Sequence, residues 1–312
     1  MPVIVVLVAV VATQHATRAW AASDARTFAD KIVRAARVNR GVCAIIGGRR
    51  DLPMGIVRAS ELFVHVRQPN EQAADEVRRA ADEAGLGIDR LVVEHGEPSR
   101  LPYATNLVDV VVAAGLSRRA LDVFSVEEIL RVLRPGGKAI IVVEDSAGVD
   151  ADALRGWAKG GNRIKVWRDG FGTWLRFSKP PLEGVDDWTH WEHGPDNNPV
   201  SCDRVIKAPY MTQFMAGPFD IARPAITTAA GGRTFLATGH IAQHVREWET
   251  VNRLIARNGY NGVILWERGL PDGYLSHRSA YVASADTFYL MDGDSCLMLD
   301  PETGEEKGRI RI

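Results

Sequence analysis

The chain has 312 residues with a formal net charge of −1, and 25% of its residues are charged. A chain of this length can bury the cores of two modest domains. Because the charge is balanced, without a basic excess or a charged tail, we expect no nucleic acid among its partners.

Residues 2–12 form an apolar run that is too short to span a bilayer as a helix. Ala19-Trp20-Ala21 then provides a small-x-small cleavage pattern, so we expect segment 1–22 to be a signal peptide cut after Ala21. The protein would then be exported to the periplasm or cell envelope, with no integral membrane segment after cleavage. No basic residue precedes Val3, which leaves open a start further upstream, or an N-terminal strand instead of a signal peptide.

The stretch from residue 24 to residue 95 alternates between helical and strand patterns. Apolar residues recur at helical spacing in three segments, and short β-branched runs lie between them. The predicted helices are 24–38, 52–59 and 70–84, and the predicted strands are 41–46, 61–66 and 90–95.

Two strongly apolar β-branched runs, 107–113 and 138–143, enclose a helical segment at 125–133. Ser125 can cap this helix, and Pro135-Gly136-Gly137 is expected to end it. Strands with so few polar residues, linked by a helix, indicate parallel pairing with both faces of the sheet buried.

The same stretch carries the motif LPYxxNxxDVV, followed by EIxRVLRPGG. Its residues are Leu101, Pro102, Tyr103, Asn106, Asp109, Val110, Val111, Glu128, Ile129 and Arg131 to Gly137. The motif resembles class I S-adenosylmethionine-dependent methyltransferases of type 11. The resemblance extends from about residue 41 to residue 180 and implies an α/β domain over 23–180 with a Rossmann-like seven-stranded sheet. A further helix at 149–158 and a hairpin at 163–177 agree with its element order.

The resemblance implies S-adenosylmethionine as cofactor, bound partly by a glycine-rich turn after the first strand. Gly47 and Gly48 occupy this turn, adjacent rather than alternating, and Arg49 and Arg50 follow them. Glycine allows the backbone to approach a ligand where a Cβ would intrude. A plain turn without a cofactor contact is the alternative.

The family also implies an acid after the second strand, which accepts hydrogen bonds from the ribose hydroxyls. Arg67 and Gln68 stand there instead. Gln68 can accept one bond through its amide oxygen, whereas Arg67 would bring positive charge towards the sulfonium. Glu97 matches the acid that pairs with adenine, with Leu101 at family spacing, or is a solvated loop acid. Ala113 lies where substrate-proximal residues are expected, and no catalytic residue can be named.

Residues 181–312 are predicted to form a second, all-β domain. Segment 186–203 is rich in aromatic residues, His, Asn and Pro and has no helical period. Segments 253–268 and 295–310 are similar, each reading strand, polar turn, strand, about forty residues apart, which is typical of a propeller blade. The predicted strands are 233–237, 252–257, 263–268, 279–284, 287–291 and 295–299.

The run 279–306 resembles one blade of a pyrroloquinoline-quinone (PQQ)-type β-propeller. The blade pattern falls on Tyr289, Leu299, Asp300, Thr303 and Gly304. The resemblance implies an incomplete propeller-like domain of one to two blades, whereas a closed propeller needs at least four. We therefore expect the sequence to be the N-terminal fragment of a longer protein. The blades present do not support PQQ as a cofactor.

Two functions follow from these resemblances. The first is an exported methyltransferase joined to a propeller, and the alternative is a non-catalytic exported binding or scaffold protein whose propeller holds a small molecule or a protein partner. A PQQ-dependent dehydrogenase could be judged only with the missing blades. The pairs His190/His193 and His240/His244 have spacings that could bind a metal, but neither matches a metal signature, so no metal site is expected.

Overall fold

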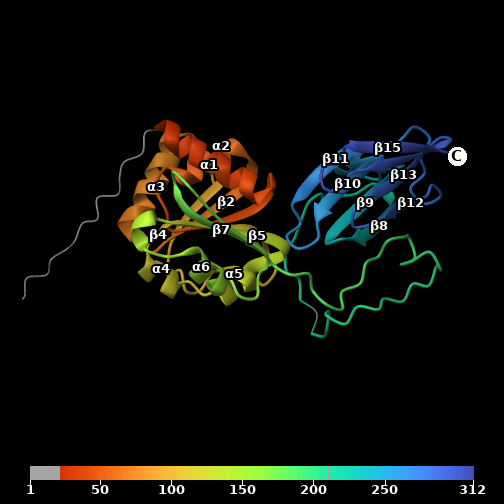
Figure 1. Cartoon of the computed structure of the whole chain (residues 1–312). Coiled ribbons are helices and arrows are strands. Elements are labelled where there is room, and N and C mark those ends of the chain that lie inside the picture. The colour runs from red at the N-terminus through yellow and green to blue at the C-terminus, as the bar shows by residue number, and fades with distance from the viewer. Residues whose placement is uncertain (1–21, 210) are drawn as a thin grey trace, which may run out of the picture.

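The computed structural model describes residues 22–209 and 211–312, which form two units joined by a long irregular segment (Figure 1). The predicted signal peptide, and the N-terminal strand that is its alternative, lie outside the described residues. Within these residues no helix is both long and apolar enough to cross a membrane.

The first unit is built on a seven-stranded sheet with the order β3-β2-β1-β4-β5-β7-β6. β1 to β5 pair in parallel, and β7 is antiparallel to both β5 and β6. The expected seven-stranded sheet is therefore confirmed. Its strands are β1 Arg40–Ile46, β2 Glu61–Gln68, β3 Leu91–His95, β4 Val108–Leu116, β5 Leu133–Val143, β6 Asn162–Asp169 and β7 Gly172–Ser178.

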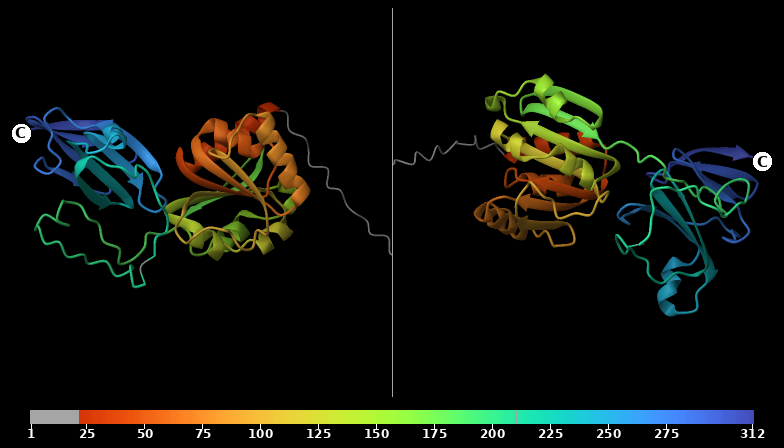
Figure 2. Two further views of the ribbon diagram at one scale, coloured as in Figure 1. Left: turned by 180° about the vertical axis from the view of Figure 1, so that it is seen from behind. Right: turned by 90° about the horizontal axis from the view of Figure 1, so that it is seen from below.

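Helices cover both faces of this sheet (Figure 2). α1, α2 and α3 bury Phe28, Ile56 and Ala80 against one face, and α4, α5 and α6 bury Leu121, Ile129 and Leu154 against the other. Two apolar cores with polar outer surfaces result. The helices are α1 Ala22–Ala36, α2 Leu52–Ala59, α3 Glu71–Glu83, α4 Arg118–Val123, α5 Val126–Val132 and α6 Ala151–Trp157, with a 3-10 turn η1 at Asp145–Ala147.

The start of α5 agrees with the sequence, whereas its end is shorter than expected. The Ser125 hydroxyl accepts the backbone N–H of Glu128 at 3.2 Å, which is the predicted cap. α5 ends at Val132, because Leu133 already pairs with Val108 as the first residue of β5. The short α4 was not predicted.

The second unit consists of two four-stranded antiparallel sheets, with the orders β11-β10-β9-β8 and β12-β13-β14-β15. Neither the sheets nor the segments between them close a propeller within the described residues. The strands are β8 Arg223–Ala230, β9 Arg233–Ile241, β10 Arg253–Asn258, β11 Ile264–Gly269, β12 Tyr281–Ala283, β13 Phe288–Asp292, β14 Ser295–Leu299 and β15 Glu306–Arg311, with a 3-10 turn η2 at Val245–Thr250. The predicted repeat corresponds to the hairpins β10–β11 and β14–β15.

Aromatic side chains hold the two sheets of the second unit together. The Phe288 ring centroid lies 4.6 Å from that of Phe235 and 6.3 Å from that of Trp266. The Trp266 indole N–H also donates to the carbonyl of Pro301 at 3.2 Å. Gly304 ends the β14–β15 turn with a φ of +74°, and a Cβ there would lie 2.6 Å from the Trp266 ring. Only glycine allows this close approach.

We therefore predict that Gly304→Ala destabilises the second unit more than Gly293→Ala. Both glycines have left-handed backbones, with φ of +74° and +60°, but a Cβ at Gly293 meets no atom within 4 Å. The control should cost about 1 kcal/mol, from backbone strain alone. Gly304→Ala should cost a further 1–3 kcal/mol or so, because the indole must move. Urea denaturation followed by tryptophan fluorescence measures both, and equal losses would contradict the account.

Asp109, on β4, joins the second unit to the first. Its side chain is fully buried. The carboxylate accepts the backbone N–H of Val42 at 2.8 Å and an N–H of the Arg134 guanidinium. It also accepts the side-chain amides of Asn258 and Asn261 in the second unit, at 2.8 and 2.7 Å. Asp109 lies near the amino end of β4, so the second unit contacts the amino-terminal edge of the parallel strands.

A second contact at this edge comes from Arg40, the first residue of β1. Its guanidinium donates to the carbonyls of Ile264 and Leu265 at 3.2 and 3.0 Å, and it pairs with Glu61 of β2. Both carbonyls belong to β11, so the docking does not depend on the Asp109 cluster alone.

Asp109→Ala is expected to lower the free energy of unfolding by about 3–5 kcal/mol, because it leaves the largely buried Arg134 charge without its carboxylate partner. Asp152→Ala is the matched control: Asp152 pairs with Arg155 at 2.7 Å on the surface, so its loss should cost no more than about 1 kcal/mol. Chemical denaturation of the two variants gives the comparison. A loss for Asp109→Ala as small as that of the control would refute the assigned role.

Candidate functional site at the carboxyl edge of the sheet

The turn after β1 leaves open space above its backbone. Gly47 and Gly48 have φ of +63° and +89°, which favour glycine. The Gly47 N–H donates to the carbonyl of Arg67 at 2.7 Å, which ties the turn to the end of β2. A Cβ built at Gly47 would meet no atom within 4 Å, and one at Gly48 would make only ordinary contacts. Glycine is therefore required by the backbone, and a ligand can approach Gly47.

Gln68, the last residue of β2, faces this turn. Its side chain is 3% exposed, and its amide nitrogen donates to the carbonyl of Gly48 at 3.2 Å. A carbonyl only accepts hydrogen bonds, so it fixes which end of the amide faces Gly48. The amide oxygen points elsewhere and accepts no hydrogen bond from the part of the chain that the structure describes. This oxygen is a preoriented acceptor beside the glycine turn.

Arg67 turns to the other side of β2, as strand alternation requires. Its guanidinium pairs with the carboxylate of Glu94, on β3, at 2.8 Å. It also covers Gly96, where a Cβ would lie 2.1 Å from the guanidinium carbon. The sequence indicates that Arg67 brings positive charge towards a sulfonium, and in the structure the Glu94 carboxylate pairs with that charge.

His65 and Tyr103 lie next to the Arg67–Glu94 ion pair. The His65 Nδ1 lies 2.9 Å from the Tyr103 hydroxyl, and its Nε2 lies 3.4 Å from the Glu94 carboxylate. Burial lowers the pKa of the His65 imidazole from its ordinary value, although the neighbouring Glu94 acts in the opposite direction. Burial also raises the pKa of the Tyr103 hydroxyl. Both groups are therefore held neutral near pH 7.

The remaining predicted site residues are placed differently. Glu97 is exposed in the loop after β3, and its side chain makes no hydrogen bond with a described residue. Leu101 is buried, and its N–H donates to Glu128 at 2.7 Å while its carbonyl accepts from Arg131 at 3.0 Å. Two side chains of α5, Glu128 and Arg131, therefore hold the backbone of Leu101 in place. Ala113 is buried in β4 opposite Ile46, one residue before Gly47. The edge thus brings together Gly47, Gly48, Gln68 and Ala113.

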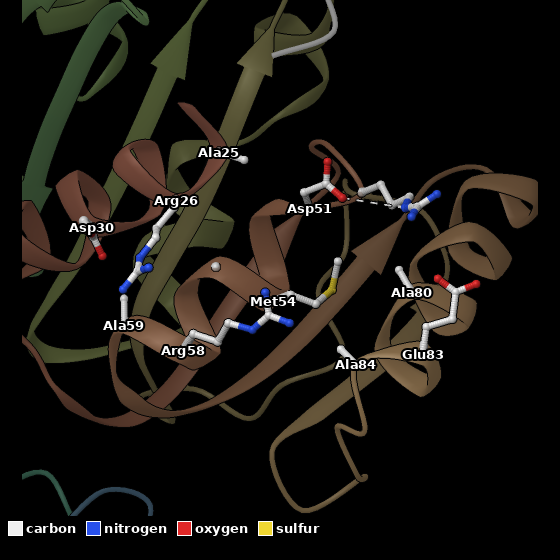
Figure 3. A pocket seen from close by; sticks show the side chains of 12 residues that line it. Ala25, Arg26, Asp30, Asp51, Met54, Arg58, Ala59, Ala80, Glu83 and Ala84 are labelled. Carbon is white, nitrogen blue, oxygen red and sulfur yellow. Dashed lines mark ion pairs between the residues drawn. The ribbon is translucent and has the colours of Figure 1, made fainter. Parts of the chain in front are cut away.

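A cavity of about 700 Å³ lies beside this edge, over α2 and between α1 and α3 (Figure 3). Arg50 and Asp51 line its end next to the glycine turn, and they pair at 3.6 Å. Arg26 and Arg58 line it further along (Figure 3). Neither Gly47 nor Gln68 lines this cavity, so it is separate from the acceptor at Gln68.

No group of three or more His, Cys, Asp or Glu side chains is placed to hold a metal ion among residues 22–209 and 211–312. His193 instead bonds to Asp186 at 2.8 Å, and His190 bonds to the Thr189 hydroxyl at 2.7 Å. All three cysteines are free thiols.

Comparison with known proteins finds no matching family model and no matching curated protein. Solved structures do resemble the chain. A proposed S-adenosyl-L-methionine-dependent methyltransferase from Methanococcus maripaludis is 18% identical, with 53% of this chain and 89% of that chain covered and a TM-score of 0.45. The [4+2]-cyclase SpnF is 19% identical, with 53% of this chain and 84% of that chain covered and a TM-score of 0.44. An S-adenosylmethionine-dependent O-methyltransferase from Thermotoga maritima is 15% identical, with 54% of this chain and 69% of that chain covered and a TM-score of 0.42.

Likenesses this distant say nothing about activity. The strand order of the first unit is itself that of the class I methyltransferase fold, as the resemblance implied.

The sequence does not reveal three contacts of the structure: the hydrogen bond between Gln68 and Gly48, the ion pair of Arg67, and the hydrogen bonds of Asp109. An aspartate inside the apolar run 107–113 was the one available signal, because a buried carboxylate requires partners.

The lowered pKa of His65 predicts a pH dependence of stability. A neutral buried imidazole is stabilising above its unfolded pKa of 6.5, and this contribution is lost as the pH falls below that value, because the unfolded state then binds more protons. We expect the free energy of unfolding to fall between about pH 8 and about pH 5.5, and less steeply in His65→Gln. Urea denaturation at both pH values measures this. Equal slopes in the two proteins would contradict the prediction.

Proposed function

We propose that the first unit binds S-adenosylmethionine at the carboxyl edge of its sheet and acts as a methyltransferase. The observation that carries this proposal is the unpartnered, preoriented amide oxygen of Gln68 beside the open Gly47–Gly48 turn. A ribose hydroxyl can donate to that oxygen. Gln68 would then accept one of the two ribose hydrogen bonds that the acid after the second strand accepts in the family.

The other residues at this edge are compatible with a nucleoside ligand. The bare backbone at Gly47 gives room for the methionine and ribose, and Glu97, exposed after β3, is available to the adenine amino group. The pairing of Arg67 with Glu94 reduces the repulsion between Arg67 and a sulfonium. When bound, S-adenosylmethionine supplies an electrophilic methyl group. Its transfer depends mainly on alignment, which a site without a dedicated base can provide.

For the second unit, the proposal is a partial PQQ-like β-propeller that binds a small molecule or a protein partner. The two four-stranded antiparallel meanders and their repeated hairpins support the propeller-like architecture in this proposal. Export to the periplasm or cell envelope remains part of the proposal and rests on the N-terminal sequence alone. The second unit lies at the amino edge of the sheet, so it leaves the carboxyl edge accessible (Figure 1).

Isothermal titration calorimetry with S-adenosylmethionine and S-adenosylhomocysteine tests the proposal. We expect binding to the wild-type chain and about fivefold weaker binding to Gln68→Ala, since one hydrogen bond contributes about 1 kcal/mol. Gln72→Ala, on the exposed surface of α3, is the matched control and should bind like the wild type. Absence of heat at ligand concentrations of about 1 mM would exclude the methyltransferase and leave the non-catalytic binding protein.

A further inference from the structure

The cavity of about 700 Å³ over α2 takes no part in the proposed cofactor site (Figure 3). Its floor is the outer surface of α2, and its walls come from the first half of α1 and the last turn of α3. Gly55 allows this floor to pack closely against α1, since a Cβ there would lie 2.7 Å from that of Ala29. The volume lies within the range of small-molecule sites, which is about 300–1,000 Å³.

Most of the uncharged lining of this cavity is apolar and small. Met54 contributes a largely buried side chain from α2. Four alanines complete the apolar lining: Ala25, Ala59, Ala80 and Ala84. Their short side chains leave the space between the helices open, and the apolar part of a ligand can pack against them.

Two arginines that line the cavity have no partner among the described residues. Arg26 lies near the start of α1, and Arg58 lies in the last turn of α2 (Figure 3). Neither forms an ion pair or a hydrogen bond with a described residue, whereas Arg67 and Arg134 of the same unit both pair with carboxylates. Two guanidinium groups on one cavity repel each other. A carboxylate that accepts hydrogen bonds from both relieves this repulsion.

An acid lies at the opposite end of the cavity. The carboxylate of Glu83, on α3, is on the far side from Arg26 (Figure 3), and it bonds to no described side chain or backbone group. Of the two other acids in the lining, Asp51 pairs with Arg50 at 3.6 Å, and Asp30 lies beyond Arg26, away from Glu83. The cavity is therefore net positive at its α1 end and negative at its α3 end.

We propose that this cavity binds a small linear zwitterion, of which a tripeptide is the simplest example. Its carboxylate accepts hydrogen bonds from Arg26 and Arg58, its ammonium group donates to Glu83, and its apolar part lies on the alanine-lined surface. The terminal carboxyl and amino groups of a peptide are both charged near pH 7. The proposal is independent of cofactor binding, because neither Gly47 nor Gln68 lines the cavity.

The distribution of charge distinguishes this ligand from simpler ones. In a single α-amino acid both charged groups are attached to one carbon, so they cannot reach the two ends of the cavity together. A simple anion leaves Glu83 unpaired and is repelled by it. An extended tripeptide spans about 10 Å and carries its charges at opposite ends.

Isothermal titration calorimetry with trialanine tests the proposal. We expect trialanine to bind the wild-type chain. N-acetyl-trialanine and trialanine amide should each bind about threefold to fivefold more weakly, because each lacks one charged contact with an exposed side chain. Alanine should also bind more weakly, since its charges lie too close together. Salt at about 0.5 M should weaken the binding of trialanine, because it screens the exposed charges.

Matched variants assign each charged contact. Glu83→Gln should remove the preference for trialanine over its acetylated form. Arg26→Gln and Arg58→Gln should instead reduce the preference for trialanine over its amide. The controls are Asp82→Asn and Arg34→Gln, at exposed residues of α3 and α1 that do not line the cavity, and both should bind like the wild type.

Three results would overturn the proposal. The first is the absence of heat with trialanine at about 10 mM. The second is equal affinity for trialanine and N-acetyl-trialanine, because the cavity would then be a site for anions alone. The third is alanine binding as tightly as trialanine, which would show that the two ends of the cavity do not act together. Circular dichroism of each variant verifies that its fold is unchanged.

Discussion

The buried carboxylate of Asp109 is the centre of the junction between the two units, and Arg40 adds a second contact beside it. Asp109 is fully buried at the amino end of β4, and a buried charge is tolerated only when it is paired and hydrogen-bonded. Arg134 supplies the opposite charge from within the first unit. Asn258 and Asn261 supply two further donors from the β10–β11 turn of the second unit. Because four donors converge on one carboxylate, the second unit is fixed against the amino edge of the sheet.

This placement separates the proposed cofactor site from the second unit. The glycine turn and Gln68 lie at the carboxyl ends of β1 and β2, and Asp109 lies at the opposite edge. The seven residues of β1 span about 23 Å between these edges. The second unit therefore supplies no residue to the carboxyl edge. The proposed cofactor site is therefore separated from the second unit by the length of the strands.

The sequence predicted the sheet well because its strands are long, apolar and separated by clear helices. β4 and α5 illustrate this, since the run 107–113 and the cap Ser125 identified both. The strand β8 was missed because its sequence RPAITTAA has weak alternation and is ordered by pairing with β9. At the site, Gln68 was identified from its position, but its bond to Gly48 depends on the turn geometry. The charge of Arg67 was recognised, whereas Glu94, its partner, comes from another strand 27 residues later. Contacts between distant segments are set by the fold and leave no local pattern.

The central claim is that a nucleoside binds beside Gln68 while the Asp109 junction stays intact. Nuclear magnetic resonance of the isotope-labelled chain tests it most directly, during titration with S-adenosylhomocysteine. The account predicts shifts of the backbone amides of Gly47 and Gly48 and of the side-chain amide of Gln68, with those of Asn258 and Asn261 unchanged. Shifts confined to the asparagines, or none at the glycine turn at saturating ligand, would contradict it.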